Sequence, residues 1–459
     1  MSKYEINELY GHEESGLHLA RLLTDLGERT LYDAVSQCNR CGYCETACPT
    51  YMLTGRETLS ARGRNQFLRR LMEGRTKDPA SAEESFSTCL LCGACSSACY
   101  AKVPTPDLVL EGRRSGRGYG QSFAARLAVD LLLNRRWLFE PLLKAGYLLK
   151  RLGFAGLARR LGLYEFAGLG AVGTAQDAIG RAPLRFLRDL FRKDPTLQAS
   201  GKTDISWAYF APCGPNYLYT EVGLATVALL KRFLGRGVFQ DNFCCGLLAY
   251  NYGRIPEARE FARKNILKFE ELRSVFGDFP VVGDCASCVA FMKSYEQLFT
   301  GDELWRPRAK AFADAVKDIL EILPAEKLEG RRPAGAVTYH DSCRACHGQG
   351  IRAEPRAALK KLAGEAFREM PESDWCCGGA GAYAFTQTAL SEEILDRKIR
   401  NIASTRAATV LAGATSCLLQ LGAGLKAKYP SARVVHYSVF IDELTRPEKP
   451  SPRNGKIPR

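Results

Sequence analysis

Cys38-Asn-Arg-Cys41-Gly-Tyr-Cys44-Glu-Thr-Ala-Cys48-Pro49 and Cys89-Leu-Leu-Cys92-Gly-Ala-Cys95-Ser-Ser-Ala-Cys99 are two copies of one pattern, C-x2-C-x2-C-x3-C. One tight loop can supply three thiolates to a cubane iron–sulfur cluster, and the fourth cysteine of such a run ligates the other cluster. The spacing therefore predicts two [4Fe-4S] clusters. We expect the ligands to be Cys38, Cys41, Cys44 and Cys99 for one cluster, and Cys89, Cys92, Cys95 and Cys48 for the other. The alternatives are a disulfide framework or paired structural zinc sites, which also use C-x2-C pairs.

Length and composition indicate a globular protein with more than one domain. The chain has 459 residues, of which 46% are hydrophobic, and this is enough for two or three separate cores. The first ten residues are polar and lack the apolar stretch of a signal peptide, so we expect the 18 cysteines to stay reduced in the cytoplasm. No apolar run is long enough to cross a bilayer, so the expected location is cytoplasmic, with peripheral attachment to the inner face of the membrane as an option.

Positive charge is concentrated in one segment of the chain. The formal net charge is +14, and residues 108–193 contain sixteen Lys or Arg against six Asp or Glu. This segment is either a set of solvated helix faces or a docking surface for an anionic membrane, a quinone system or an acidic partner. No nucleic-acid recognition motif accompanies the charge, so we expect no nucleic-acid partner.

Periodic apolar residues predict helices through the first 200 residues. Leu19, Leu22, Leu23 and Leu26 fall on one helical stripe before Gly27, and residues 60–74 read as a helix that ends at Gly74. Residues 131–144 and 184–191 are amphipathic and basic, and on a membrane Trp137 and Phe139 would lie at headgroup level. The alternative is that these helices pack on their own domain.

The chain after residue 200 alternates short strands with helices. Strands are expected near Trp207, Val281 and Val337, with a helix over 221–234 after the first. This order favours an α/β domain with a mainly parallel sheet. The proline-rich, charged end, residues 446–459, is expected to be disordered.

A second cysteine pattern repeats within this half. Each copy has an upstream Cys, a Cys-Cys-Gly triplet and a downstream Cys. Corresponding cysteines of the two copies lie about 130 residues apart in the sequence. The first copy has Cys213, Cys244, Cys245, Cys285 and Cys288, and the second has Cys343, Cys376, Cys377 and Cys417. Adjacent cysteines followed by glycine suit an iron–sulfur cluster, and a buried structural pair is the alternative.

Other residues give weaker signals. Cys346 is an additional thiol, and His340 and His347 flank Cys343 and Cys346, where they are either loop histidines or partners of a cluster sulfur. Gly168-Leu-Gly170-Ala-Val-Gly173 matches a dinucleotide fingerprint, but no strand or βαβ unit surrounds it. We therefore expect no flavin or NAD in this chain.

The tandem repeat resembles the cysteine-rich CCG domain of heterodisulfide reductase subunits and of the iron–sulfur subunits of glycolate oxidase and lactate-utilisation complexes. The most specific motifs are Cys41-Gly-Tyr-Cys44-Glu-Thr-Ala-Cys48-Pro-Thr-Tyr51, His340-Asp-Ser-Cys343 and Cys376-Cys-Gly-Gly-Ala-Gly-Ala-Tyr383. The resemblance implies an electron-transfer subunit that takes electrons from a flavoprotein dehydrogenase or an electron-transfer flavoprotein and passes them toward quinone or another carrier. Because the first repeat keeps all five cysteines, it also implies an alternative, a heterodisulfide reductase-like catalytic subunit with a non-cubane cluster there.

The expected fold is mixed α+β and α/β, with a helical ferredoxin-type domain before the tandem CCG repeats. The expected domains are 1–107 with the two [4Fe-4S] clusters, 108–200 as a basic helical linker or docking segment, 201–330 and 331–445 as the two repeats, and 446–459 as the tail. One or two further iron–sulfur clusters are expected in the repeats.

Overall fold

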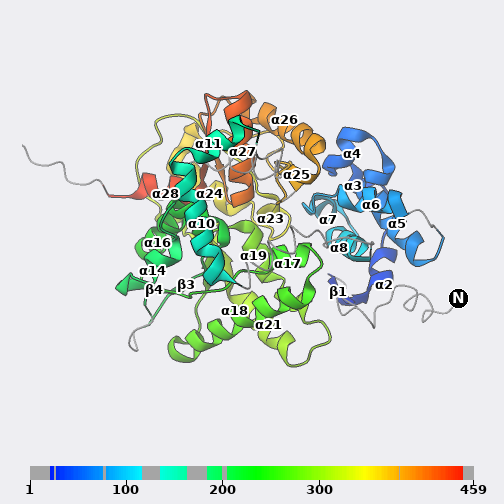
Figure 1. The fold of residues 1–459 in the computed structure, drawn as a ribbon, viewed down its shortest axis with the longest axis horizontal. Coiled ribbons are helices and arrows are strands. Elements are labelled where there is room, and N and C mark those ends of the chain that lie inside the picture. Colours follow the sequence, from blue (N-terminus) through cyan, green and yellow to red (C-terminus); the bar gives the residue numbers. More distant parts are fainter. Residues whose placement is uncertain are drawn as a thin grey trace, which may run out of the picture.

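A computed structural model describes residues 21–24, 27–75, 79–115, 135–162, 183–198, 204–381 and 383–447. It is a mixed structure in which a helical N-terminal part lies beside a larger part with two parallel sheets (Figure 1). The fold class expected from the sequence is confirmed. The domain boundaries stay a prediction, and the expected disordered tail beyond residue 447 and the Gly168–Gly173 motif lie outside the described residues.

The N-terminal part is built from a hairpin and short helices that surround the first cysteine runs. Its elements are β1 (Arg21–Thr24), β2 (Gly27–Thr30), α2 (Leu31–Ser36), α3 (Tyr43–Thr46), α4 (Pro49–Thr54), η1 (Glu57–Leu59), α5 (Ala61–Met72), α6 (Pro79–Ser87), α7 (Ala94–Ala98) and α8 (Thr105–Ser115). The helix expected over 60–74 is confirmed as α5, which Ser60 caps by accepting from the Gly63 amide.

The helix expected before Gly27 is wrong for the described residues. Leu22 and Leu23 lie in β1, which pairs with β2 in an antiparallel hairpin, whereas Leu19 and Leu26 lie outside the described residues. A tertiary contact explains the difference, because the Leu23 amide donates to Gln297 Oε1 at 2.5 Å and Leu22 is buried. Pairing with a distant residue overrides the helical spacing of the leucines.

The middle of the chain contributes α10 (Arg136–Arg151), α11 (Phe154–Arg160), α14 (Leu187–Phe191) and η3 (Pro195–Leu197). The helix expected over 131–144 is α10 for its described part, and it runs further than expected, to Arg151. No helix in the described part of the chain is long and apolar enough to span a membrane.

The first repeat forms a four-stranded parallel sheet with the order β4-β3-β5-β6. Its elements are β3 (Trp207–Tyr209), α15 (Cys213–Tyr217), α16 (Thr220–Leu234), β4 (Gly237–Phe239), α17 (Leu247–Asn251), α18 (Ile255–Phe276), β5 (Val281–Gly283), α19 (Ala286–Lys293), α20 (Tyr295–Leu298), α21 (Trp305–Ala315), β6 (Val316–Asp318), α22 (Ile319–Ile322) and η4 (Ala325–Lys327). The strands are short and buried on both faces, as in other parallel sheets.

The second repeat forms a three-stranded parallel sheet with the order β7-β8-β9. Its elements are β7 (Val337–Tyr339), α23 (Cys343–Cys346), α24 (Ala353–Ala363), η5 (Gly364–Ala366), α25 (Tyr383–Thr386), α26 (Thr388–Ser404), β8 (Thr409–Ala412), α27 (Thr415–Lys428), β9 (Arg433–His436) and α28 (Tyr437–Thr445). A single parallel bridge between Val337 and Phe367 stands where β4 pairs with β3 in the first repeat.

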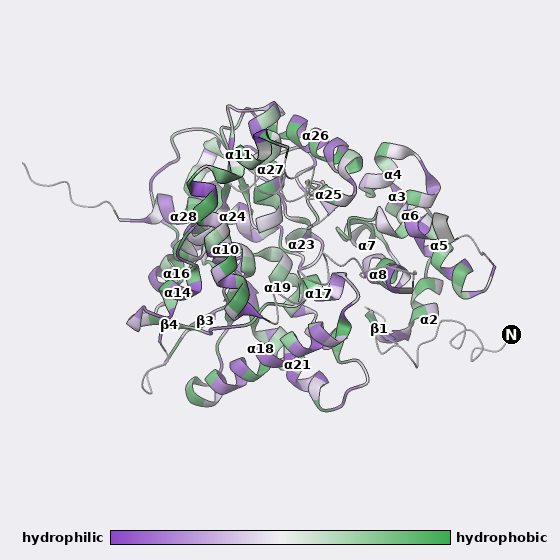
Figure 2. Ribbon diagram, in the orientation of Figure 1, coloured by the Kyte–Doolittle hydropathy of each residue, from purple (hydrophilic) through white to green (hydrophobic). Residues whose placement is uncertain are grey.

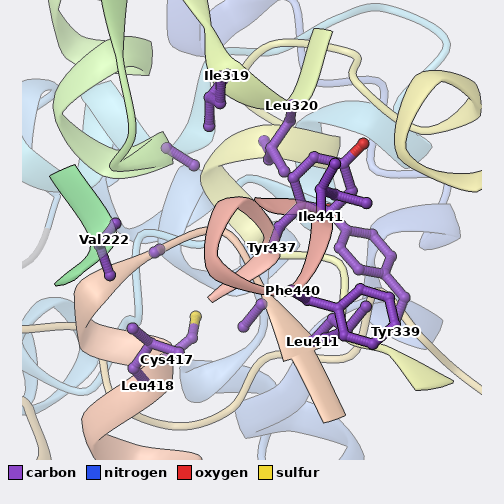
Figure 3. Packing of buried hydrophobic residues seen from close by; sticks show 14 of the residues in the cluster. Val222, Ile319, Leu320, Tyr339, Leu411, Cys417, Leu418, Tyr437, Phe440 and Ile441 are labelled. Atoms are coloured by element: carbon purple, nitrogen blue, oxygen red, sulfur yellow. The ribbon is translucent and has the colours of Figure 1, made fainter. Parts of the chain in front are cut away.

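The two repeats share one hydrophobic core. Figure 3 shows Val222 of α16 and Leu320 of α22 from the first repeat near Tyr437 and Ile441 of α28 from the second. Helix α28 packs on α16, where Arg232 pairs with Asp442 at 2.9 Å, and α22 packs on α24 in the corresponding way. Because the last helix of each repeat packs against the first long helix of the other, the repeats are held as one body.

Candidate iron–sulfur centres

The first two sets of cysteines line two adjacent cavities. Cys38, Cys41, Cys44 and Cys99 line a cavity of about 230 Å³, and Cys48, Cys89, Cys92 and Cys95 line a smaller one of about 20 Å³. Each cavity thus collects three thiols of one run and the last thiol of the other. Cys95 also borders the larger cavity, so the two sites share a wall.

The two cysteine loops have the same backbone conformation. Arg40 and Gly42 have φ of 59° and 85°, and Leu91 and Gly93 have φ of 54° and 83° at the same places in the second run. Alternating left-handed residues curl the chain so that successive amides point inward, as in backbone nests that hold anions. In the second loop the Leu91 amide donates to Cys89 Sγ at 3.5 Å.

Arg64 shows that the smaller cavity suits an anionic group. Its side chain is buried on α5 and lies 3.8 Å from Cys48 Sγ through Nη1. Its hydrogen bonds to oxygen all go to neutral acceptors, the carbonyl oxygen of Ser85 and the hydroxyls of Thr50 and Thr88. A buried cation is stable only beside a negative charge, and no carboxylate contacts this one among the described residues. Thiolates that carry an iron–sulfur cluster supply that charge.

In the first repeat, the cysteines gather at the carboxyl ends of the strands. Cys213 follows β3 and Cys285 follows β5, the two neighbouring strands between which the strand order reverses. Ligands of open α/β sheets bind at this crevice. Hydrogen bonding with Cys213, then with Cys245 and Cys285, raises the pKa of Cys288, so these four thiols lie close together.

The second repeat gathers its cysteines in the same way. Cys377 Sγ lies 3.5 Å from Cys417 Sγ, and His340 Nε2 lies 3.4 Å from the same sulfur. Hydrogen bonding to Cys376 and then burial raise the pKa of Cys343, so the four expected cysteines form one group. His340, Cys377 and Cys417 present ligand atoms within 4.8 Å of one another, all buried.

A left-handed glycine shapes each Cys-Cys-Gly turn. Gly246 and Gly378 have φ of 87° and 82°, and their amides donate to Cys244 Sγ at 3.5 Å and Cys376 Sγ at 3.4 Å. A Cβ on Gly378 would lie 2.6 Å from the carbonyl oxygen of Ser391, so only glycine fits there. The turn directs both neighbouring thiols into the site.

Cys346, His347 and His340 lie near the cysteines of the second repeat and make different contacts. Cys346 is buried, and its Sγ donates to the carbonyl oxygen of Cys343 at 3.9 Å rather than to a sulfur among the described residues. His347 points to the N-terminal part, where Nδ1 lies 3.1 Å from Ser97 Oγ. Burial lowers the pKa of His340, so its ring is neutral, and with the proton on Nε2 it donates to Cys417.

The four groups of thiols form a connected series. Burial, and next the charges of Cys38 and Cys99, raise the pKa of Cys44 to about 12. Burial is also the main cause that raises the pKa of Cys95, followed by Cys89 and Cys48 of its own cavity and then by Cys44 of the neighbouring one. Burial and then Cys343 raise the pKa of Cys92, which joins the N-terminal part to the second repeat.

The second and first repeats are joined through one threonine. Thr415 follows β8, two residues before Cys417, and its Oγ1 lies 3.7 Å from Cys285 Sγ of the first repeat. The Ala286 amide donates to the carbonyl oxygen of Gly413 at 2.9 Å and fixes the same contact. The series of thiol groups therefore begins at the larger N-terminal cavity and passes to the smaller one. It continues to the cysteines of the second repeat and ends at those of the first repeat.

The junction between the N-terminal part and the second repeat is closely packed. Leu90, Trp375, Tyr383 and Ile394 form a small buried cluster there, with Cys92 and Cys343 packed against it. The Tyr383 hydroxyl donates to the carbonyl oxygen of Thr88 at 3.0 Å. Water is therefore kept away from the point where the two groups of thiols meet.

Comparison with known proteins gives the same two parts. Residues 34–103 match a model described as a 4Fe-4S dicluster domain, and residues 207–293 and 337–422 each match a Cysteine-rich domain named CCG. A Lactate utilization protein A of Geobacillus sp. (strain WCH70) is 33% identical over 237 residues, which cover 51% of this chain and 97% of the relative. This chain belongs to the family of iron–sulfur subunits that carry CCG domains.

A second relative extends over nearly the whole of this iron–sulfur subunit. The Probable glycolate oxidase iron-sulfur subunit of Bacillus subtilis (strain 168) is 27% identical over 439 residues, 93% of this chain and 97% of the relative. The match includes both kinds of domain in one chain. Iron–sulfur clusters are thus the cofactors of the family member described here, and an electron-transfer role follows from them.

Sequence reasoning missed the parts played by Arg64 and Thr415. A signal for Arg64 exists, because Ala61, Arg64, Asn65 and Leu68 are all buried on α5 at the spacing of an apolar stripe. A charged residue on such a stripe indicates a buried partner. Thr415 has no signal of this kind, because its contact with Cys285 depends on how the two repeats meet.

Proposed function

We propose that this iron–sulfur subunit conducts electrons inside a multi-subunit oxidoreductase, from a flavoprotein partner toward quinone or another carrier. The donor would be a hydroxy-acid dehydrogenase of the glycolate or lactate type, or an electron-transfer flavoprotein. Bound clusters would supply one-electron transfer at thiolate-ligated iron. The cysteines named above would hold two [4Fe-4S] clusters in the N-terminal part and one or two more in the repeats.

The exposure of the cysteines carries this proposal. Of the 18 cysteines, Cys41 and Cys213 are exposed, and the rest are buried or half-buried. Cys41 belongs to the first group of the series and Cys213 to the last, so each end of the series reaches the surface while the middle is covered. A conductor needs this arrangement, because a donor and an acceptor must approach its two ends and solvent must be kept from the centre.

The chain's own residues perform the remaining work. The N-terminal loops and the two Cys-Cys-Gly turns orient the thiols, Arg64 compensates negative charge, and the packing around Tyr383 excludes water at the central junction. The surface near Cys41 also carries Tyr43 and Tyr100, whose rings stack edge to face at 5.4 Å and are both exposed. This surface is the proposed contact for one redox partner.

Removing a cysteine at the junction between the N-terminal part and the second repeat tests the proposed electron-transfer route. Cys343→Ser should leave the electron paramagnetic resonance signals of the N-terminal clusters in place but block electron transfer between a flavoprotein donor and a quinone analogue. Cys346→Ser is the matched control, because it removes a buried thiol three residues away that bonds only a carbonyl. Equal electron-transfer rates in wild type and Cys343→Ser would overturn the proposed route.

A second candidate function rests on the first repeat. Its five thiols lie together, and Cys213 alone among them is exposed, so a disulfide substrate could reach this site. In this alternative the first repeat would be a catalytic site with a non-cubane cluster. Electron paramagnetic resonance spectra of the reduced and thiol-treated protein distinguish the electron-transfer function from the catalytic one. If the spectra show only cubane signals and these do not respond to thiol, the catalytic function is excluded.

A further inference from the structure

Helix α10 faces the solvent with its apolar side. Its exposed side chains are Trp137, Pro141, Leu142, Ala145, Leu148 and Leu149, with Arg151 at its end. Trp137 is 77% exposed. A surface helix of a water-soluble domain has the opposite arrangement, with apolar residues turned toward the core.

The opposite side of α10 contacts the protein through polar and apolar residues alike, since Leu143 and Tyr147 pack with Phe186 there. Glu140 pairs with Arg136 and accepts from the Tyr217 hydroxyl at 3.0 Å, and Lys144 pairs with Asp189 at 2.8 Å. The Tyr147 hydroxyl donates to the carbonyl oxygen of Tyr217 at 3.1 Å. These contacts fix the orientation of the helix and turn its leucines outward.

Phe139 departs from the expectation drawn from the sequence. That expectation placed Trp137 and Phe139 together at the level of lipid headgroups. In the structure the Phe139 ring packs edge to face on Tyr217 at 5.4 Å, so it belongs to the inward side. Trp137 remains on the outward side with the leucines.

The apolar surface continues beyond α10. Leu152 lies in the turn after the helix, and Phe154, Leu157 and Leu161 are exposed on and after α11. Both helices lie on the outside of the C-terminal part (Figure 1), and hydrophobic colouring appears along them in Figure 2. Large apolar surfaces of this kind mark sites of interaction.

The charged residues around this apolar surface indicate what kind of partner it binds. Residues 135–162 contain seven Lys or Arg and one acidic residue, Glu140, which is paired on the inward side. The exposed cations Arg135 and Arg160 lie at the two ends of the pair of helices. An apolar face with a tryptophan and flanking cations is the pattern of helices that lie in the interface of an anionic membrane.

We propose that the outward face of α10 and α11 binds the surface of an anionic phospholipid bilayer. The leucines enter the boundary between headgroups and acyl chains, Trp137 lies at headgroup level, and Arg135 and Arg160 meet lipid phosphates. The subunit is then held against the membrane in one orientation by these two surface helices. This inference goes beyond the electron-transfer role and does not depend on it.

Vesicle binding by the full-length, cluster-loaded protein tests the proposal. Sedimentation with vesicles of phosphatidylglycerol and phosphatidylethanolamine should exceed that with phosphatidylcholine by about tenfold, and the excess should fall as salt is raised. Leu149→Gln with Leu152→Gln should weaken binding at least tenfold. Leu267→Gln with Leu304→Gln is the matched control, because these leucines are 49% and 67% exposed against 50% and 64% for the tested pair.

Tryptophan fluorescence gives a second measurement of binding to vesicles. Lipids brominated near the headgroup should quench part of the protein's tryptophan emission, and Trp137→Phe should remove that part. Arg135→Gln with Arg160→Gln should weaken binding to anionic vesicles about tenfold and leave the low affinity for neutral vesicles unchanged.

Three results would overturn the membrane assignment. Wild-type protein could fail to bind anionic vesicles, the Leu149 and Leu152 variant could bind as wild type does, or wild type could form a dimer that this variant abolishes. The last result would assign the face to a second copy. Since no redox partner is present in these measurements, each of these results leaves the proposed electron-transfer function standing.

Discussion

The guanidinium of Arg64 lies 3.8 Å from Cys48 Sγ, inside the protein and away from carboxylates among the described residues. A fixed positive charge at this place would stabilise the more negative, reduced state of the cluster that we expect Cys48, Cys89, Cys92 and Cys95 to hold. The position of Arg64 would therefore affect the reduction potential of that cluster, and the spacing of the cysteines does not reveal this effect.

Replacing Arg64 should lower the reduction potential of one N-terminal cluster. Hydrogen bonds to charged groups contribute about 1.5 to 3 kcal/mol, and a tenfold change in equilibrium corresponds to about 59 mV for one electron. We expect Arg64→Met to lower that potential by about 60 mV or more in a titration followed by electron paramagnetic resonance. Arg69→Gln on the same helix, which removes a half-buried pair with Glu73, should leave both potentials unchanged.

Cysteines 343 and 346 should differ sharply in their effect on iron content. Cys343→Ser removes a thiol that contacts Cys376, whereas Cys346→Ser removes one that contacts a backbone oxygen. We expect iron per chain to fall for Cys343→Ser and to stay at the wild-type value for Cys346→Ser, as measured by metal analysis. Iron loss in the second variant would place Cys346 among the ligands.

Gly378 and Gly381 provide a test of backbone geometry. Both have positive φ, but a Cβ at Gly381 meets nothing within 4 Å, whereas one at Gly378 would lie 2.6 Å from Ser391 O. Gly381→Ala should cost about 1 to 2 kcal/mol, the penalty of a left-handed alanine. Gly378→Ala should cost clearly more and release iron from the second repeat. Thermal unfolding of the two variants measures the difference, and similar melting temperatures would refute the steric argument.

Asp318 should make stability depend on pH. Burial, as the main cause, raises its pKa from 3.8 to about 7. The folded protein therefore holds the proton more tightly, so the free energy of unfolding falls as pH rises from about 4 to about 7 and is flat above that. Each pKa unit corresponds to about 1.4 kcal/mol, which gives at most about 4 kcal/mol from this group.

The variant Asp318→Asn isolates this contribution. An asparagine keeps the acceptor for the Leu320 amide and caps α22 as well as aspartate does. The variant should therefore show a smaller fall in melting temperature between pH 4 and pH 7 than wild type. An unchanged pH profile would mean that Asp318 does not carry the buried proton.

Local cysteine spacing predicts the chemistry of this protein. Two runs of C-x2-C-x2-C-x3-C and two Cys-Cys-Gly repeats define which thiols can share a metal group, because such groupings depend on local spacing. Alternation of short strands and helices also predicted the parallel sheets. These features are local, so they can be read along the chain.

The connections between the groups of thiols, in contrast, follow from the folded structure. It brought Cys92 beside Cys343, placed Thr415 of one repeat against Cys285 of the other, and left Cys41 and Cys213 exposed at the two ends. It also turned the predicted helix at Leu22 into a strand and set the leucines of α10 outward. Each of these facts depends on contacts between residues far apart in the chain, and periodicity does not specify which face of an element will find a partner.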